Sequence, residues 1–252
     1  MQMSNNFGAK LQSGQPLIGT IVTLADPQAI EVISSCGFDW LFVDGEHAPL
    51  GAMEIQGILQ AVHDRCPCAV RIPANQEVYI KQALDSGANG VIVPRVNDAE
   101  MARQAVGYAK YYPLGERSVG ISRAHGFGMH FAEYIKTANE RTAVIVQIEH
   151  KEGVENIDAI LDVKGVNAVF IGPYDLSASL GKIGKLTDPE VVRCIHHVRD
   201  RCLATQTPVG IFTMDAGAVK SLADEGCTLI AVGIDTVMLG ESAKRVLDQT
   251  RF

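Results

Sequence analysis

The sequence lacks the features that mark membrane, secreted and zinc-binding proteins. No part of its 252 residues approaches the roughly 18 consecutive apolar residues of a membrane span, and the opening MQMSNNFGAK has no signal-peptide core. Its six cysteines are irregularly spaced and include no CxxC pair, which argues against a zinc site or a disulfide framework. We therefore expect a cytoplasmic protein with reduced, buried thiols.

Positive charge is also scarce. Lysine and arginine total 22 against 29 aspartate and glutamate residues, the formal net charge is −7, and no block of five like charges occurs. Nucleic-acid binding depends on a basic face that displaces counterions, and an anionic membrane surface repels a chain of this charge. We expect small-molecule ligands, and neither nucleic acid nor a membrane as a partner.

A glycine-rich nucleotide loop is missing too, because no GxGxxG follows the first apolar run, and this disfavours an open doubly wound sheet. The sequence does contain eight short apolar runs, each followed by a segment of helical periodicity. This alternation predicts an α/β fold with parallel strands, a single (β/α)8 TIM barrel over residues 1–252. The expected strands are 17–23, 40–44, 68–72, 90–94, 143–149, 168–172, 208–212 and 229–233, and the expected helices are about 27–36, 51–64, 77–86, 98–110, 152–161, 188–205, 215–225 and 235–250.

Helix-boundary signals agree with this frame. Asp26 and Asp188 each precede a proline, which is typical of an N-cap before the first helical residue, and Gly87 and Gly226 lie where left-handed C-terminal caps occur. Residues 111–139 break the rhythm with an irregular stretch rich in Gly, Arg and His. A connection of this length is usually functional or part of an interface.

Charged residues at the carboxyl ends of the strands are the first candidates for chemistry, because the active sites of such barrels lie there. The second strand ends in DGEHAP, which contains Asp44, Glu46 and His47. Histidine exchanges protons near neutral pH, and a nearby carboxylate can orient the ring and raise its basicity. The alternative is a solvated loop histidine next to a helix-capping acid.

Arg71 lies between Val70 and Ile72 in the third predicted strand. If those two residues pack against helices, the two-residue repeat directs Arg71 into the barrel mouth. Its planar guanidinium could bind a carboxylate or a developing oxyanion. The alternative is a structural ion pair with Glu46 or Asp44.

Gln147 and Glu149 share one face of the fifth strand because they are two residues apart. A carboxylate on a core strand needs a partner, for which a cation is one candidate and a salt bridge to Arg71 or Lys151 the alternative. Asp175 follows the sixth strand after the turn at Gly172 and Pro173, and alone it would be interpreted as an N-cap.

Taken with Glu149 on the adjacent strand end, Asp175 becomes a candidate metal ligand. Two carboxylates without a His or Cys cluster suit a hard divalent cation such as Mg²⁺ or Mn²⁺, with coordination positions left for water and a chelating substrate. Gly233 and Asp235 could meet an anion or form a capped turn, and the sequence leaves this open.

The chain resembles the HpcH/HpaI aldolase family of metal-dependent class II pyruvate aldolases nearly from end to end. The similar segments are GFDWLFVDGEHAP, VRIP, YYPLGERSVG, VQIEHKEGVENIDAI, VFIGPYDLSASLG and LIAVGIDTVMLG. The resemblance implies a phosphoenolpyruvate-mutase-like barrel, often a homohexamer whose last helix is exchanged between neighbours.

The resemblance also implies roles for individual residues. Glu149 and Asp175 match the metal ligands, with Mg²⁺, Mn²⁺ or Co²⁺ as the cation. His47 matches the catalytic histidine and Asp44 the acid that orients it. Arg71 matches the arginine that steadies the enolate oxygen. Gln147 matches a residue near the bound keto acid, and the turn at Gly172 and Pro173 matches the backbone that receives the substrate carboxylate.

We therefore expect a lyase that reversibly cleaves a 4-hydroxy-2-oxo acid to pyruvate and an aldehyde. A Schiff-base lysine is the other standard route for aldol chemistry, but no lysine falls at a predicted strand end, and Lys151 is two residues beyond Glu149. Two alternatives remain: a citrate-forming or related keto-acid condensation enzyme on the same scaffold, and a non-catalytic barrel that only binds a small anion.

Overall fold

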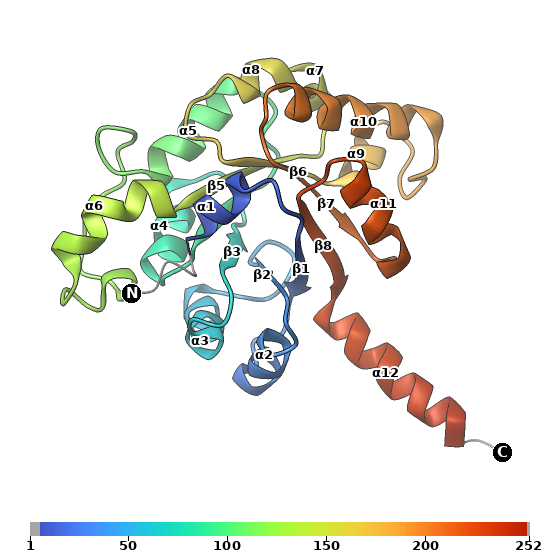
Figure 1. The fold of residues 1–252 in the computed structure, drawn as a ribbon, viewed down its shortest axis with the longest axis horizontal. Coiled ribbons are helices and arrows are strands. Elements are labelled where there is room, and N and C mark those ends of the chain that lie inside the picture. Colours follow the sequence, from blue (N-terminus) through green and yellow to red (C-terminus); the bar gives the residue numbers. More distant parts are fainter. Residues whose placement is uncertain (1–5, 251–252) are drawn as a thin grey trace.

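Eight parallel strands close into a barrel in chain order, with β1 paired to β8 (Figure 1). The computed structural model describes residues 6–250. The strands are β1 Leu17–Val22, β2 Trp40–Asp44, β3 Cys68–Arg71, β4 Gly90–Val93, β5 Ala143–Ile148, β6 Ala168–Ile171, β7 Val209–Thr213 and β8 Leu229–Ile234. The (β/α)8 prediction is confirmed, and each predicted strand lies within two residues of the observed one. Residues 1–5 and 251–252 of the predicted domain lie outside the described part.

Helices alternate with the strands and surround the barrel (Figure 1). They are α1 Phe7–Gln12, α2 Pro27–Ser34, α3 Ala52–Val62, α4 Glu77–Asp85, α5 Ala99–Ala109, η2 Arg123–His125, α6 Phe131–Arg141, α7 Lys151–Glu155, α8 Ile157–Leu161, α9 Pro173–Ser179, α10 Pro189–Ala204, η3 Ala216–Ala218, α11 Val219–Asp224 and α12 Asp235–Thr250. The sequence did not predict α1, and the segment expected to be irregular holds η2 and α6. The helix predicted over 152–161 is divided at Asn156 into α7 and α8.

The helix boundaries confirm the predicted caps. The carboxylate of Asp26 accepts from the Ala29 N–H (2.9 Å) and that of Asp188 from the Glu190 N–H (2.9 Å). Gly87 and Gly226 both have φ +98°, the left-handed conformation that ends a helix at low cost only in glycine.

The side chains inside the barrel follow the two-residue repeat of each strand. Trp40 and Phe42 of β2 pack there with Phe170 of β6, and Phe7 of α1 stacks on Trp40 from the amino end (ring centroids 6.1 Å). Gly19 makes room for the indole, because a Cβ at that position would lie 2.5 Å from Trp40 Nε1. The interior is therefore filled with side chains below the carboxyl ends of the strands.

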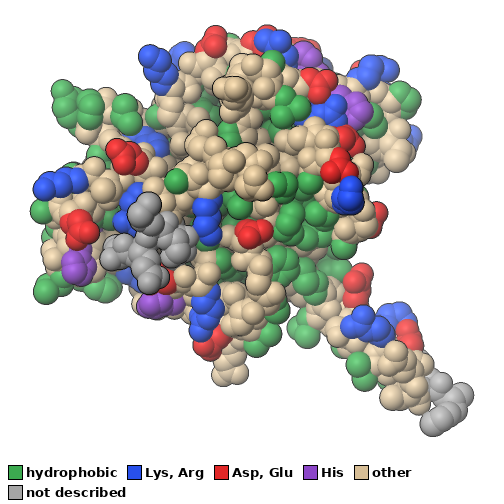
Figure 2. Space-filling model, viewed as in Figure 1, with side chains coloured by type: hydrophobic (Ala, Val, Ile, Leu, Met, Phe, Trp, Pro, Cys, Tyr) green, Lys and Arg blue, Asp and Glu red, His purple; other side chains and the backbone are tan. Residues whose placement is uncertain are grey.

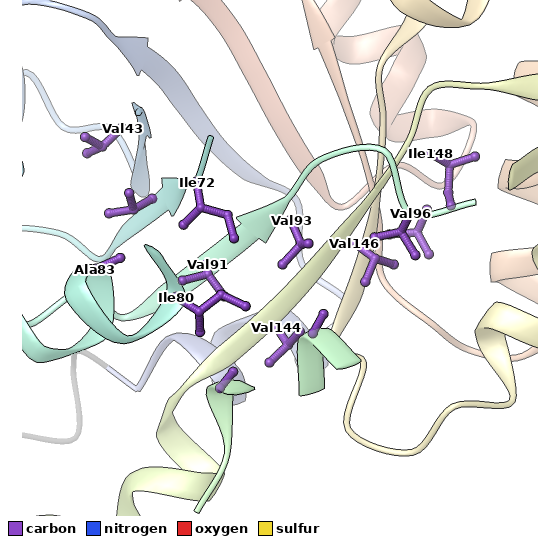
Figure 3. Close-up of a cluster of buried hydrophobic side chains, with 14 of the residues drawn as sticks. Val43, Ile72, Ile80, Ala83, Val91, Val93, Val96, Val144, Val146 and Ile148 are labelled. Atoms are coloured by element: carbon purple, nitrogen blue, oxygen red, sulfur yellow. The ribbon is translucent and has the colours of Figure 1, made fainter. Parts of the chain in front are cut away.

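The opposite faces of the same strands form a second apolar layer against the helices. Figure 3 shows part of this layer, where Val91 of β4 lies next to Ile80 of α4 and Val146 of β5 lies next to Val96. Both strand faces are covered, which explains why the strands are near-continuous apolar runs in the sequence. A polar residue on the inner face of such a strand therefore stands out.

Residues 110–141 pack at the amino end of the barrel, and their polar groups bond mainly to the backbone. The Lys110 ammonium donates to the carbonyl oxygens of Asn139 and Thr142, and the Arg123 guanidinium donates to that of Ser86 (2.7 Å). His125 is buried; its Nδ1 accepts from the Gly128 N–H (2.9 Å), and its Nε2 donates to the Gly120 carbonyl oxygen (2.8 Å). His125 therefore helps to hold residues 110–141 together, a role that the sequence did not predict.

The last helix, α12, leaves the end of β8 and projects from the body of the molecule (Figure 1). Figure 2 shows hydrophobic and charged side chains along it, away from the rest of the surface. Neither this helix nor any other in residues 6–250 is long and apolar enough to cross a membrane.

Candidate active site

Arg71 and Gln147 lie on the face of their strands that points into the barrel. Arg71 follows Ala69, which faces the interior, whereas Val70 belongs to the layer facing the helices. Gln147 likewise continues the inner phase of Ala143 and Ile145. The predicted orientation of these strands is therefore confirmed, and their polar side chains lie at the carboxyl end of the barrel.

Arg71 is buried against two carboxylates. Strand register pairs it with Asp44 of β2, and its Nε and Nη2 atoms donate to the two Asp44 carboxylate oxygens at 3.0 and 2.7 Å. Its Nε also lies 3.3 Å from Glu46 Oε2, and its guanidinium lies over the Phe42 ring. The ion pair that the sequence offered as an alternative is present, so this arginine is held rigidly at the barrel mouth.

The pKa values of the two acids shift in opposite directions. Burial alone would raise the pKa of Asp44, but the hydrogen bond and positive charge of Arg71 outweigh it, and the pKa of Asp44 is lowered. Burial raises the pKa of Glu46 more than the Arg71 charge lowers it. Asp44 is thus the permanent anion of this group.

His47 follows β2 in an exposed loop, with 64 % of its side chain accessible. Asp44 Oδ1 accepts from the backbone N–H groups of Glu46 and His47 (3.1 and 3.2 Å), so it fixes the loop that carries the imidazole. The carboxylate beside the ring itself is Glu46, with Oε2 3.8 Å from His47 Nε2. Asp44 therefore positions His47 through the backbone, and the ring neighbour is the residue that the sequence had not selected.

Glu149 is buried just beyond the end of β5 and is held on both sides. Its Oε1 accepts from the Arg95 N–H (2.8 Å), and its Oε2 accepts from Gln147 Nε2. Burial raises the pKa of Glu149 to about 7, the Arg95 hydrogen bond opposes this, and the charges of Glu46 and Asp175 add to it. A cation in this place would relieve the repulsion among the three acids.

Gly172 lets the β6 end approach these two side chains. A Cβ there would lie 2.8 Å from Glu149 Oε2 and 2.9 Å from Gln147 Nε2. The N–H of Gly172 already donates to the Ile148 carbonyl (3.0 Å), and Pro173 has no N–H. Gly172 and Pro173 therefore shape the site but have no free N–H group. A substrate carboxylate at this turn would have to accept from the backbone N–H groups of the residues that follow them.

The loops after β2, β4, β5 and β6 enclose a cavity of about 340 Å³. It is lined by Glu46, His47, Arg95, Glu149, His150, Asp175, Ala178 and Ser179. Arg71 and Gln147 lie beneath this lining, in contact with Glu46 and Glu149 respectively. The structure thus brings together the predicted residues from four strand ends.

The cavity fits a divalent cation held by few protein ligands. Within residues 6–250 no cluster of three or more His, Cys, Asp or Glu side chains is arranged as a metal cage, so Glu149 and Asp175 would be the two protein ligands. The buried Gln147 Oε1 has no hydrogen-bond partner among the described residues. A buried oxygen without a partner is costly, and bound water or substrate would satisfy it.

Arg95 and His150 line the cavity although sequence reasoning selected neither. Arg95 directly follows the apolar run of β4 in VIVPRV, so the same strand-end rule that selected Arg71 could have found it. His150 follows Glu149, and its Nδ1 accepts from the Glu152 N–H (3.3 Å).

Asp235 has a structural role. Its buried carboxylate accepts from the N–H groups of Thr23 and Leu24 (both 2.8 Å) and from the Thr23 hydroxyl. These bonds tie the start of α12 to the loop after β1, where the barrel closes. The sequence left two interpretations open for Asp235, anion binding and a capped turn. The structure agrees with the cap, although the N–H groups that Asp235 caps follow β1.

The fold is a (β/α)8 barrel with a carboxylate-lined mouth, and comparison with known proteins gives the family. The model of the HpcH/HpaI aldolase/citrate lyase family matches residues 17–241. This chain belongs to that family.

Two curated relatives are aldolases. A hydroxypyruvate/pyruvate aldolase of Roseovarius nubinhibens is 38 % identical over 98 % of this chain and 97 % of its own length. A 5-keto-4-deoxy-D-glucarate aldolase of Escherichia coli is 37 % identical over 97 % and 96 %. The solved structure of a HpcH/HpaI aldolase/citrate lyase family protein from Burkholderia cenocepacia superposes with a TM-score of 0.94 at 33 % identity, covering 98 % of this chain and all of that one.

Proposed function

We propose that this protein is a divalent-metal-dependent aldolase that reversibly cleaves a 4-hydroxy-2-oxo acid to pyruvate and an aldehyde. The observation that carries the proposal is a cavity at the carboxyl ends of the strands that is lined by Glu149, Asp175 and His47 together. Both curated relatives described above are aldolases, which supports the reaction type, while their names differ in substrate.

Glu149 and Asp175 would hold Mg²⁺, Mn²⁺ or Co²⁺, oxygen-binding cations that two carboxylates and water suit. When bound, the cation would supply Lewis-acid polarisation of the keto acid, which stabilises the negative charge left on C3 and the keto oxygen as the C3–C4 bond breaks. The carboxylate of Glu149 is already fixed in position, because the Arg95 N–H and the Gln147 amide each donate to one of its oxygens.

His47 would accept the proton of the 4-hydroxyl group during cleavage and return it during addition. Its exposure at the cavity and the neighbouring Glu46 carboxylate suit a group that exchanges protons with substrate and solvent. The imidazole lines the cavity, so a substrate bound there would meet it.

Arg71 would oppose negative charge on the keto oxygen. Its Nε and Nη2 are engaged by Asp44, and no bond from its Nη1 to any described residue is seen. Because Asp44 already fixes the guanidinium, its Nη1 can bind substrate without a further loss of side-chain conformational entropy. Gln147 lies beside Glu149 with its amide oxygen unpaired in the described structure, which suits contact with the keto acid or its water.

Lysine positions favour this route over a Schiff base. Lys110 is the buried lysine whose pKa burial lowers to about 8, but its ammonium bonds to carbonyl oxygens at the amino end of the barrel. Lys151 is exposed and is absent from the cavity lining. The lysine with a suitable pKa therefore lies at the wrong end of the strands for aldol chemistry.

The test is aldol addition of pyruvate to a panel of aldehydes, with Mn²⁺ or Mg²⁺ present and after treatment with EDTA. We expect product with metal and a loss of at least about 10²-fold with chelator, reversed by added cation. Full activity after chelation would refute the metal-dependent aldolase.

A citrate-forming or related condensation remains the second candidate, because the family description includes citrate lyases. It would use oxaloacetate as the keto acid and an acyl thioester in place of the aldehyde. Assaying oxaloacetate with acetyl-CoA beside the aldehyde panel distinguishes the two reactions. Exchange of pyruvate protons into deuterated water with metal present would exclude a barrel that only binds an anion.

We also propose a homo-oligomer, a hexamer by the family resemblance, in which α12 packs on a second copy. Its exposed apolar residues Leu239, Val246 and Leu247 recur on one helix face at i, i+7 and i+8. Light scattering should give a mass several times 27.1 kDa, and Leu239→Lys with Val246→Lys should lower it. A monomeric wild-type protein would contradict this.

A further inference from the structure

We propose that Glu46 is a positioning residue for the candidate base His47. Its carboxylate binds the hydrogen on His47 Nε2, so that Nδ1 is the ring atom that accepts the substrate proton. This inference rests on the proposed aldol reaction, and it adds which ring nitrogen reacts and which acid orients the ring. The family resemblance gave that orientation to Asp44, but the structure commits both oxygens of Asp44 to other donors.

A turn after β2 brings the two side chains to the same cavity. Neighbouring residues of an extended strand point in opposite directions. Here Asp44 Oδ1 accepts from the N–H groups of Glu46 and His47 (3.1 and 3.2 Å), which bends the chain at these residues. Both side chains therefore line the cavity, and Glu46 Oε2 lies 3.8 Å from His47 Nε2.

The carboxylate of Glu46 lacks the hydrogen bond that its burial calls for. Its Oε2 is buried without a hydrogen-bond partner within residues 6–250. Arg71 Nε is 3.3 Å away, but this atom has one hydrogen and donates it to Asp44 Oδ1 (3.0 Å). A buried oxygen without a donor is costly, so Glu46 has a reason to bind an N–H group that can move to it.

The imidazole of His47 is such a donor. Its side chain is 64 % accessible, and neither ring nitrogen has a hydrogen bond to another described residue. A rotation of this mobile ring would shorten the 3.8 Å separation from Glu46 to a hydrogen bond. Hydrogen bonds between catalytic groups are often long in a free enzyme and shorten once substrate is bound.

The charges around Glu46 suit an acceptor for this ring. Burial raises the pKa of Glu46, and the positive charges of Arg71 and His47 oppose the rise. The negative charges of Asp44 and Asp175 increase it. An N–H group that donates to Glu46 favours the ionised carboxylate. The other titratable residues that line the cavity are Arg95, Glu149 and His150.

The proton transfer then has a defined direction. During cleavage the O–H bond of the 4-hydroxyl group breaks as its hydrogen bonds to His47 Nδ1. The C4–O bond becomes a carbonyl, and the C3–C4 electron pair passes to C3 and the keto oxygen. The imidazolium that forms keeps its Nε2 hydrogen on Glu46. The carboxylate offsets this new positive charge, so it stabilises the transition state more than the resting neutral ring.

Nitrogen NMR of histidine-labelled, metal-free protein tests the orientation without catalysis. The chain has seven histidines, and the spectrum of His47→Ala identifies the signals of this ring. At a pH where the ring is neutral, the wild type should carry the hydrogen almost entirely on Nε2. Glu46→Ala should shift the population toward Nδ1, because an exposed ring without a partner exchanges between both tautomers. An identical tautomer ratio in the two proteins would overturn the proposal.

Glu46→Gln tests the charge during aldol addition of pyruvate with Mg²⁺. We expect kcat to fall about 10- to 100-fold, with the KM for pyruvate and the Mn²⁺ affinity within about threefold of the wild type. The acidic limb of the kcat/KM profile should move to lower pH by roughly half a unit to one unit, because the variant no longer favours the protonated ring. Glu46→Asp keeps the charge and should recover part of kcat.

Glu152→Gln is the matched control. Glu152 is an exposed acid 4.0 Å from His150 Nδ1 and outside the cavity lining, so its loss changes the net charge equally. It should leave kcat and the acidic limb unchanged.

Two kinetic outcomes for Glu46→Gln would also overturn the proposal. An unmoved acidic limb shows that the carboxylate does not act on the base, and a loss that follows weaker Mn²⁺ binding places Glu46 at the cation. Failure of the wild type to form any aldol product would instead refute the aldolase. The tautomer ratio is measured in the resting protein, so the two failures are distinguishable.

Discussion

The two ends of the barrel use buried polar groups in opposite ways. At the amino end, residues 110–141 border a cavity of about 620 Å³, larger than the one at the carboxyl end, yet three buried or half-buried cations of this segment are committed to structure. Lys110 and Arg123 donate to carbonyl oxygens, and Arg117 bonds to Asp85 (2.6 Å) and lies over the Tyr111 ring. These groups stabilise the fold.

At the carboxyl end, acids line one cavity and a buried amide oxygen lacks a partner, whereas the unpartnered Nε of Arg117 at the amino end belongs to a guanidinium already paired with Asp85. Glu46, Glu149 and Asp175 line one cavity, and Gln147 Oε1 is buried without a hydrogen bond in the part of the chain that the structure describes. Such an arrangement is costly for stability unless a ligand completes it. The comparison teaches that cavity size alone does not identify the candidate site, and that the arrangement of the polar groups is the better guide.

The largest expected effect is the loss of a metal ligand at the carboxyl end. Glu149→Gln removes the buried negative charge but keeps the shape, so we expect activity to fall by at least about 10²-fold and Mn²⁺ affinity with it. Calorimetric titration with Mn²⁺ measures the binding, and thermal unfolding serves as the control for folding. A variant that binds Mn²⁺ like the wild type would remove Glu149 from the metal site.

Removal of the imidazole separates chemistry from metal binding. His47→Ala should lower kcat by about 10² to 10⁴-fold, the range for a general base, while Mn²⁺ affinity stays within about threefold. The side chain is exposed, so the unfolding temperature should change little. Retention of full activity would assign the proton transfer to another group.

The amino end should respond in stability instead. Arg117→Met leaves the Asp85 carboxylate without its buried partner, and we expect the free energy of unfolding to fall by about 3 kcal/mol. Urea unfolding of this variant beside Arg103→Met, an exposed ion pair worth under about 1 kcal/mol, measures the difference. A large drop in kcat of folded Arg117→Met would show that the amino end also contributes to catalysis, and would contradict the contrast between the two ends.

Alkaline pH gives the smallest effect, through buried thiols. Burial raises the pKa of Cys66 and Cys227 to about 11 and that of Cys202 to about 12. Because these values lie above the ordinary 9.0, the stabilisation is complete below pH 9 and is lost as pH rises through 11 to 12.

Lys110 acts in the opposite direction, since its pKa is lowered to about 8, but it is one group against several, because burial also raises the pKa of Cys68 and of Tyr111. Urea midpoints should therefore decline from pH 9 to pH 11. Cys202→Ala should reduce this slope, while Cys36→Ala, which alters an exposed thiol, should keep it. Equal slopes in the wild type and Cys202→Ala would exclude the buried thiol as the cause.

Much of the fold and of the site could be predicted from the sequence because both depend on local periodicity. The alternation of Val70, Arg71 and Ile72 gave the orientation of the arginine, and the pair Gln147 and Glu149 gave the acidic strand end. Helix α1 was not predicted because it is too short to show a helical repeat in the sequence. It is stabilised by Phe7, which packs on Trp40 at the amino end of the barrel. Helix α6 was likewise hidden in a Gly- and His-rich segment.

The sequence by itself determined the order of strands and helices, the apolar phase of each strand and the strand ends that carry acids, because these follow from residues near one another in the chain. Only the tertiary structure decided which charges pair. Barrel closure aligns Asp44 with Arg71 and brings the Arg95 N–H to the Glu149 carboxylate. Pairing depends on distances between loops far apart in sequence, and no local pattern encodes those distances.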